Sequence, residues 1–155
     1  MKKFKILSLF MFLILFINGC TLINPKYINF STKPNNHYYT DQLNKKILNN
    51  ERFTISVFDT NLYKEIQVPN DDSSIIENFI KSLVTSDYID ESVSDKEPFR
   101  LKITFKDSKF LIKVFNNTTV SISPWDGNYA EDFISMKDVP LRYNLYDFCN
   151  YIENK

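Results

Sequence analysis

Residues 99–124, "FRLKITFKDSKFLIKVFNNTTVSISP", alternate apolar and polar side chains through three short segments. A period of two is typical of a strand with one buried face and one face in water. The segments are separated by Asp107–Ser108 and by Asn116–Asn117, and Asp, Asn and Ser all favour tight turns. The stretch therefore predicts a three-stranded antiparallel meander whose apolar face must be covered by other elements.

Further strands are expected on both sides of the meander. Toward the N-terminus, "RFTISVF" (52–58) alternates in the same way, and "KEIQV" (64–68) follows after the turn "DTNLY". Two short alternating segments joined by a compact turn predict a hairpin. On the other side, "DFISMKD" (132–138) is compatible with one more strand.

Two apolar helical stripes supply the cover for the sheet. Residues 75–84 repeat apolar side chains at helical spacing, and Ser74 and Glu77 have the spacing of a capping box. Residues 140–154 predict a second helix that starts at Pro140 and places Leu141 on its apolar face. The chain is therefore expected to be α+β, an antiparallel sheet in ββ-α-βββ-α order with two helices packed on one face.

The N-terminus has the layout of a secretory signal. Three lysines precede an apolar run over residues 6–17, which ends in "INGC" (17–20). Twelve helical residues rise only about 18 Å, whereas a bilayer core of about 30 Å needs about 20 residues. An uncleaved anchor and an ordinary secreted protein are the alternatives to a cleaved lipoprotein signal.

The "INGC" ending resembles a bacterial lipobox, although Asn18 stands where a small residue is usual. The resemblance implies cleavage after Gly19 and a diacylglycerol on the Cys20 thiol, with the lipid bilayer as partner and the extracytoplasmic face of the cell membrane as location. Two acyl chains hold a protein on a membrane where one does not. We expect residues 1–19 to be a signal peptide, 20–50 a lipidated tether in which "TDQLNKKILNN" offers a short helix, and 51–155 a single α+β domain.

Composition narrows the classes of partner. The chain has 155 residues and no net formal charge, and loss of Lys2, Lys3 and Lys5 with the signal would leave it at −3. An acidic domain lacks the basic footprint of a nucleic-acid-binding protein. Lipidation of Cys20 would leave Cys149 as the single thiol, which we expect to be a buried apolar side chain, and no metal site or cofactor is predicted.

"SPWDGNY" (123–129) is the first candidate ligand site. It holds the sole tryptophan, Trp125, and an Asp126–Gly127 turn in which glycine is expected to adopt a positive φ. Trp125, Asp126, Asn128 and Tyr129 together would suit a sugar or a peptide. The alternative is that Trp125 covers the core where the meander meets the last helix.

A second candidate is a basic patch on the outer face of the meander. Its members alternate with the apolar residues of two strands: Arg100, Lys102, Lys106, Lys109 and Lys113. Such a patch would suit a phosphate-bearing cell-wall polymer or lipid headgroups. Edge protection and solubility are the simpler explanation for these charges.

Catalytic signatures are scarce. The sole histidine, His37, lies in the predicted tether, and no nucleophile-elbow or phosphate-loop pattern is present. A glycosidase using Asp126 with Glu131 or Asp132 is the enzymatic alternative. We expect no catalytic residues and no enzyme activity.

The "INGC" ending, together with "SISPWDGN" (121–128), "EDFISM" (131–136) and "YNLYDFC" (143–149), resembles small uncharacterised lipoproteins of low-G+C Gram-positive bacteria. The resemblance covers the chain from about residue 50 onward and implies a compartment and a fold, but no activity. The sequence thus predicts a membrane-anchored, non-catalytic binding module, with an accessory lipoprotein that regulates a membrane protein as a further alternative. A cell-wall polymer or a membrane protein would be its partner.

Overall fold

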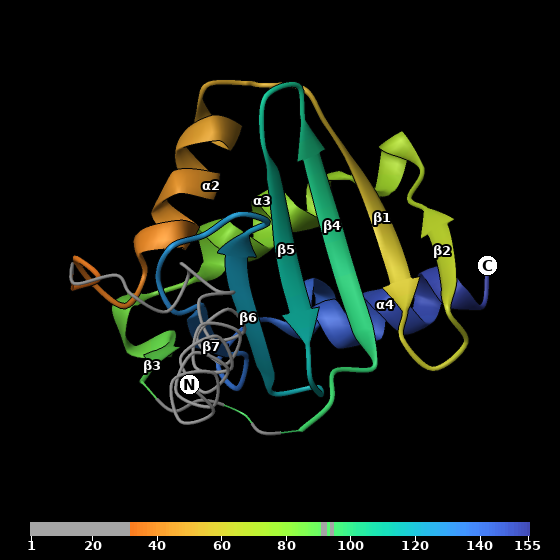
Figure 1. The fold of residues 1–155 in the computed structure, drawn as a ribbon. Coiled ribbons are helices and arrows are strands. Elements are labelled where there is room, and N and C mark those ends of the chain that lie inside the picture. Colours follow the sequence, from red (N-terminus) through yellow and green to blue (C-terminus); the bar gives the residue numbers. More distant parts are fainter. Residues whose placement is uncertain (1–31, 91–92, 94) are drawn as a thin grey trace, which may run out of the picture. The chain divides into compact units, whose positions relative to one another are not determined.

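The computed structural model describes residues 32–90, 93 and 95–155. The predicted signal peptide, the lipobox-like "INGC" and Cys20 lie outside these residues. Within them, seven strands form one antiparallel sheet in the order β2-β1-β4-β5-β6-β7-β3 (Figure 1). The α+β class and the antiparallel sheet predicted from the alternation are confirmed.

The predicted meander forms the centre of the sheet. It consists of β4 (Phe99–Phe105), β5 (Lys109–Val114) and β6 (Thr119–Pro124), with the two expected turns between them. The predicted hairpin is β1 (Phe53–Asp59) with β2 (Lys64–Gln67), and β1 joins the meander by pairing with β4. The further strand suggested after the meander is β7 (Asp132–Ser135). β3 (Tyr88–Ile89), which the sequence did not predict, pairs with β7 at the edge.

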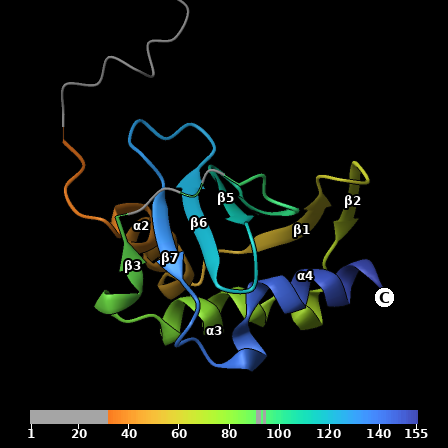
Figure 2. The same cartoon turned by 90° about the horizontal axis from the view of Figure 1, so that it is seen from below.

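The described residues form three α-helices, and all three cover one face of the sheet, where two were expected (Figure 2). They are α2 (Tyr38–Leu48), α3 (Ser74–Ser82) and α4 (Leu145–Glu153), and each buries apolar residues in the same core. Short 3-10 turns at Asn70–Asp72, Thr85–Asp87 and Leu141–Tyr143 precede or follow the helices. All the apolar positions of β4 point into that core.

The domain begins earlier than the predicted boundary at residue 51. Lys33–Lys155 forms one compact unit, and Leu43 and Ile47 of α2 belong to the core. Asn50 ends this helix with a φ of 55°, the left-handed conformation common just after a helix. Residues 33–50 are therefore part of the folded domain, because α2 buries an apolar stripe that a tether would leave in water.

Two details of helix capping also differ from the prediction. Ser74 is the first residue of α3, and the residue at the cap position is Ser73. The Ser73 hydroxyl donates to Asn70 O and does not cap the helix, so the predicted capping box does not form. Asn144, not Pro140, begins α4: its side chain accepts hydrogen bonds from Tyr146 N and Asp147 N. Leu141 then falls in the 3-10 turn before the helix and is 82% exposed, not on the apolar face.

Candidate functional site

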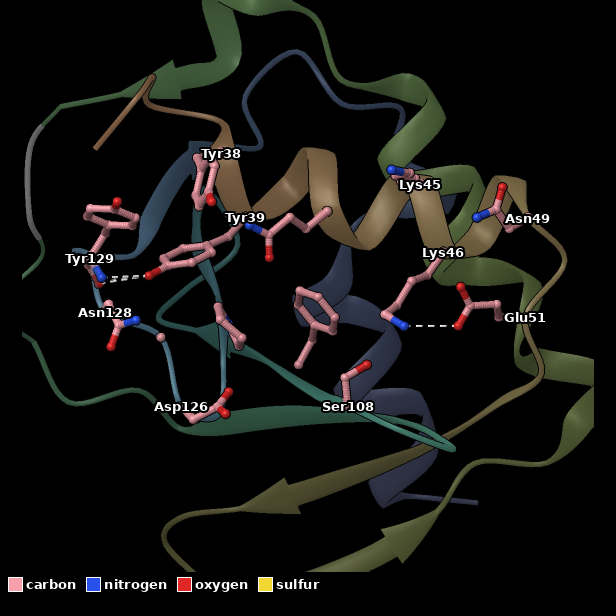
Figure 3. A pocket seen from close by; sticks show the side chains of 14 residues that line it. Tyr38, Tyr39, Lys45, Lys46, Asn49, Glu51, Ser108, Asp126, Asn128 and Tyr129 are labelled. Atoms are coloured by element: carbon pink, nitrogen blue, oxygen red, sulfur yellow. Dashed lines mark hydrogen bonds and ion pairs between the residues drawn. The ribbon is translucent and has the colours of Figure 1, made fainter. Parts of the chain in front are cut away.

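A groove of about 530 Å³ lies between α2 and the loop that joins β6 to β7 (Figure 3). One wall is the solvent side of α2, and the other is the loop at residues 126–129. The α2 wall contributes Tyr38, Tyr39, Gln42, Lys45, Lys46 and Asn49. Figure 3 shows an aromatic end, with the tyrosines of both walls, and a polar end at Lys46, Asn49 and Glu51.

Tyr39 ties the two walls together. Its ring is buried, and its hydroxyl accepts a hydrogen bond from Tyr129 N at 2.6 Å and donates one to Tyr129 O at 3.4 Å. Burial raises the pKa of this phenol above its ordinary value, despite the opposing hydrogen bond from the Tyr129 backbone. The hydroxyl thus stays protonated, so it can both donate a hydrogen bond and accept one.

Gly127 is needed for space and not for a positive φ, which corrects the sequence-based expectation. No described glycine has a positive φ. A Cβ at Gly127 would lie 2.8 Å from the Tyr39 hydroxyl oxygen and 3.1 Å from Pro124 Cγ. The glycine therefore lets the loop approach Tyr39 closely enough to form the hydrogen bond to Tyr129.

Three tyrosine rings form the aromatic end of the groove. The Tyr38 and Tyr129 rings meet edge to face, with centroids 5.4 Å apart and planes at 90°. The Tyr39 ring lies 5.4 Å from the Tyr38 ring and 6.3 Å from the Tyr129 ring. Tyr38 and Tyr129 are half-buried, so parts of both rings remain in contact with solvent.

Ion pairs organise the polar end. Lys46 Nζ lies 3.0 Å from Glu51 Oε2 and 2.9 Å from Asp107 Oδ1. Hydrogen bonds to Asp107 and Glu51 raise the pKa of this lysine. Two carboxylates neutralise one ammonium group, so Lys46 braces the end of α2 against the β4–β5 turn.

The predicted ligand residues divide between two neighbouring hollows. Asp126, Asn128 and Tyr129 line the groove. Trp125 does not: it is 64% exposed and lines an adjacent hollow with Phe105 and Lys106. Asp126 borders both hollows. The alternative interpretation of Trp125 as a cover for the core is wrong.

The predicted basic patch is broken up by carboxylates. Arg100 pairs with Glu97, Lys102 with Glu65 at 2.7 Å, and Lys113 with Glu131. Lys106 and Lys109 flank the β4–β5 turn and are exposed. The outer face of the sheet therefore carries mixed ion pairs instead of the single-sign field that the sequence suggested.

Glu131 and Asp132, the two candidate partners of Asp126 in the glycosidase hypothesis, lie toward opposite faces of the sheet. Glu131 contacts Lys113 and Ser121 on the outer face of the sheet. Asp132 is fully buried on the helix side, where its Oδ2 accepts from Thr40 N at 2.6 Å and from Thr40 Oγ1 at 2.8 Å. Its Oδ1 lies 2.6 Å from Lys33 Nζ, an ion pair without the alignment of a hydrogen bond.

The remaining candidates have structural surroundings. Cys149 is fully buried in the core, and burial strongly raises the pKa of its thiol. His37 is not in a tether: its ring lies 5.3 Å from the Tyr88 ring and its Nδ1 is 2.7 Å from Asp41 Oδ2. Among the described residues, no three His, Cys, Asp or Glu side chains gather to hold a metal ion. No helix in this part of the chain has the length and apolar character to cross a membrane.

The α2 wall of the groove was not predicted from the sequence, because residues 20–50 were assigned to the tether. Tyr39, Leu43 and Ile47 follow at intervals of four, which is the spacing of a buried helical stripe. Extending the apolar count back to Tyr39 would have placed Tyr38, Gln42 and Lys45 on the opposite, solvent-facing side.

Comparison with known proteins is consistent with this fold. A family model described as "Domain of unknown function (DUF4883)" matches residues 33–149. The "Crystal Structure of Putative Lipoprotein from Clostridium perfringens" is similar, with a TM-score of 0.74 and 31% identity, covering 80% of this chain and 100% of that chain. No curated protein matches. The predicted resemblance to an uncharacterised lipoprotein family is confirmed: the chain belongs to the DUF4883 family.

Proposed function

We propose that this protein is an extracytoplasmic lipoprotein, anchored through acylated Cys20, that binds a ligand in the groove between α2 and the β6–β7 loop without chemical change. The lipobox-like "INGC" and the similarity to the Clostridium perfringens "Putative Lipoprotein" support the anchor. The groove supports the binding role, and it is the observation on which the proposal rests.

The build of the groove favours a ligand site. Its volume of about 530 Å³ falls in the range of about 300–1,000 Å³ typical of small-molecule sites. The hydrogen bond that Tyr129 N donates to the Tyr39 hydroxyl holds the two walls together, and the Lys46–Asp107 ion pair fixes α2 to the β4–β5 turn. The partly exposed rings of Tyr38 and Tyr129 are held by their mutual contact and by Tyr39, and such preorganisation lowers the entropic cost of binding.

The hydrolase alternative lacks a comparable arrangement. Glycosidases use two carboxyl groups on either side of one bond. Glu131 and Asp132 lie toward opposite faces of the sheet and each has a cationic partner. Asp126 is exposed and lines the groove, whereas neither Glu131 nor Asp132 belongs to its lining.

Membrane attachment can be tested with the two cysteines as a matched pair. Cells that express Cys20→Ala should lose palmitate labelling and release the protein from the membrane fraction. Cys149→Ala should keep both, because its thiol is buried in the core. Digestion of the protein by a protease added to wall-less cells would support the outer face. Membrane retention and labelling of Cys20→Ala would contradict the anchor.

Binding in the groove can be tested in living cells with a photo-crosslinking residue. Placed at Asn128 in the groove, it should give a specific adduct; placed at Tyr151, which is 53% exposed on α4, it should not. Adducts of equal yield from both positions, or from neither, would contradict a binding role for the groove.

A further inference from the structure

We infer that the ligand of the groove is a neutral oligosaccharide, which packs on Tyr38 and Tyr129 and hydrogen-bonds to the amides of Gln42, Asn49 and Asn128. This inference rests on the proposed function, since it names the class of ligand for the same site.

The aromatic end fits a sugar ring. Tyr38 and Tyr129 present half-buried rings at right angles, one from each wall of the groove. A pyranose has apolar C–H faces and polar hydroxyl edges, so it can pack on one ring while its edge meets the other. Aromatic side chains with a polar handle suit ligands that are themselves half apolar and half wet.

The polar groups of the groove match hydroxyls. Gln42, Asn49 and Asn128 line it, and an amide side chain contains both N–H donors and an accepting oxygen. A sugar hydroxyl is likewise both donor and acceptor, so an amide can donate a hydrogen bond to it or accept one from it. These side chains come from both walls, which would orient a chain along the groove.

Charge argues against an anionic polymer. Lys45 and Lys46 are balanced within the lining by Glu51 and Asp126, and Lys46 is also paired with Asp107. Phosphate-bearing polymers are attracted by an excess of cationic side chains. The lining has no excess of cationic side chains, so it does not favour an anionic chain over a neutral one.

The floor of the groove argues against a peptide. β5 and β6 lie inside the sheet with a partner on each side, so no free strand edge is available for an added strand. Tyr39 and Phe110, the large rings beneath the groove, are 2% and 3% exposed. The groove therefore lacks the open apolar pocket in which peptide anchor side chains bury.

A chain longer than the groove would pass Asp126, which borders both hollows, and reach Trp125. The sole tryptophan thus becomes an internal reporter. Its fluorescence should respond to a tetrasaccharide that extends into the second hollow, and less to a disaccharide held at the aromatic end.

The test titrates the full-length protein, in a detergent without a sugar headgroup, with chitotetraose, cellotetraose and maltotetraose. We expect at least one to bind, by calorimetry and by Trp125 fluorescence. Tyr129→Ala should weaken that binding about tenfold, because it removes the ring and leaves the backbone groups that Tyr39 holds. Tyr151→Ala is the matched control with an exposed ring on α4 and should bind normally.

Two results would overturn the inference: no binding of any of the three up to about 10 mM, or equal affinity of Tyr129→Ala and Tyr151→Ala. Neither result affects the Cys20→Ala test of the anchor or the crosslinking test at Asn128, which are independent measurements. A crosslink to a protein without sugar binding would reject the carbohydrate and keep the binding module. Unaltered circular dichroism of Tyr129→Ala makes its loss of affinity a local effect.

Discussion

At the residue scale, Asp132 holds the N-terminal segment of the domain against the sheet. Its fully buried carboxylate accepts two hydrogen bonds from Thr40, in α2, and forms an ion pair with Lys33. A buried carboxylate is stable only when such partners replace its water. The chain therefore joins the sheet where residues 33–40 cross β7.

Asp132→Ala should lower the free energy of unfolding by about 3 kcal/mol, because it removes the carboxylate that pairs with Lys33 and accepts from the two donors of Thr40. The exposed Asp126 offers the control, and Asp126→Ala should stay within about 0.5 kcal/mol of the wild type. Urea unfolding followed by far-UV circular dichroism measures both. Equal stability of the two variants would show that the Asp132 contacts contribute little.

Gly127→Ala tests the close approach of the loop to Tyr39. The added methyl would crowd the Tyr39 hydroxyl and Pro124, so we expect a loss of about 1–3 kcal/mol. In a Tyr39→Phe background the nearest crowding atom is absent, and the same substitution should cost less. A double-mutant cycle measured by urea unfolding gives the coupling energy between Gly127→Ala and Tyr39→Phe. A coupling energy of zero would mean that the Tyr39 hydroxyl does not cause the loss of stability.

At the element scale, the short edge strand β3 brings Tyr88 against α2. Burial raises the pKa of Tyr88 to about 12, with a smaller opposing effect from its hydrogen bond to Thr40. The unfolded chain loses this proton near the ordinary pKa of 10.0, whereas the folded chain keeps it. The contribution of this phenol to the free energy of unfolding is therefore fully present below pH 10 and is lost as the pH rises toward 12.

The difference in unfolding free energy between wild type and Tyr88→Phe should therefore shift by about 2 kcal/mol between pH 10 and 12. Urea titrations at a series of pH values measure it. Tyr151→Phe, at an exposed position, should show no comparable shift. Parallel curves for wild type and Tyr88→Phe would rule out differential titration of this phenol.

The start of α4 depends on one side chain. Asn144 Oδ1 accepts from two backbone N–H groups of the helix, and its Nδ2 donates to Asn117 O at 2.8 Å, in the β5–β6 turn. The cap thereby joins the helix to the meander. It also explains why the helix begins at Leu145, five residues after the predicted start at Pro140.

Asn144→Ala should cost about 1–2 kcal/mol, since both the cap and the bond to Asn117 are lost. Asn144→Asp keeps the accepting oxygen and should recover part of that loss. Thermal unfolding by circular dichroism ranks the variants, with the exposed Asn154→Ala as a control within about 0.5 kcal/mol. An Asn144→Ala protein as stable as the control would mean that the cap is dispensable.

At the scale of the whole molecule, α2 decides where the domain begins. Tyr39, Leu43 and Ile47 are 2%, 0% and 7% exposed. Each buried side chain of this size contributes about 1.5–3 kcal/mol, and a whole domain is stable by only about 5–15 kcal/mol. The predicted domain 51–155 would lack all three.

A chain of residues 32–155 should fold, and one of residues 51–155 should not fold stably. Dispersed amide resonances and a cooperative thermal transition would identify the folded chain. We expect the shorter chain to show neither, because its sheet would expose the surface that α2 covers. A cooperative transition of similar midpoint in the shorter chain would restore the boundary at residue 51.

The sequence by itself determined the strands of the meander, the hairpin, α3 and the α+β class, because these depend on side-chain periods within a few residues of one another. It also placed Asp126, Asn128 and Tyr129 in one loop. Only the tertiary structure decided that α2 faces that loop and that Trp125 is exposed. It also decided that Arg100, Lys102 and Lys113 are paired with carboxylates. These properties arise from contacts between residues far apart in the sequence, such as Thr40 and Asp132, which are 92 positions apart, and no local pattern encodes such contacts.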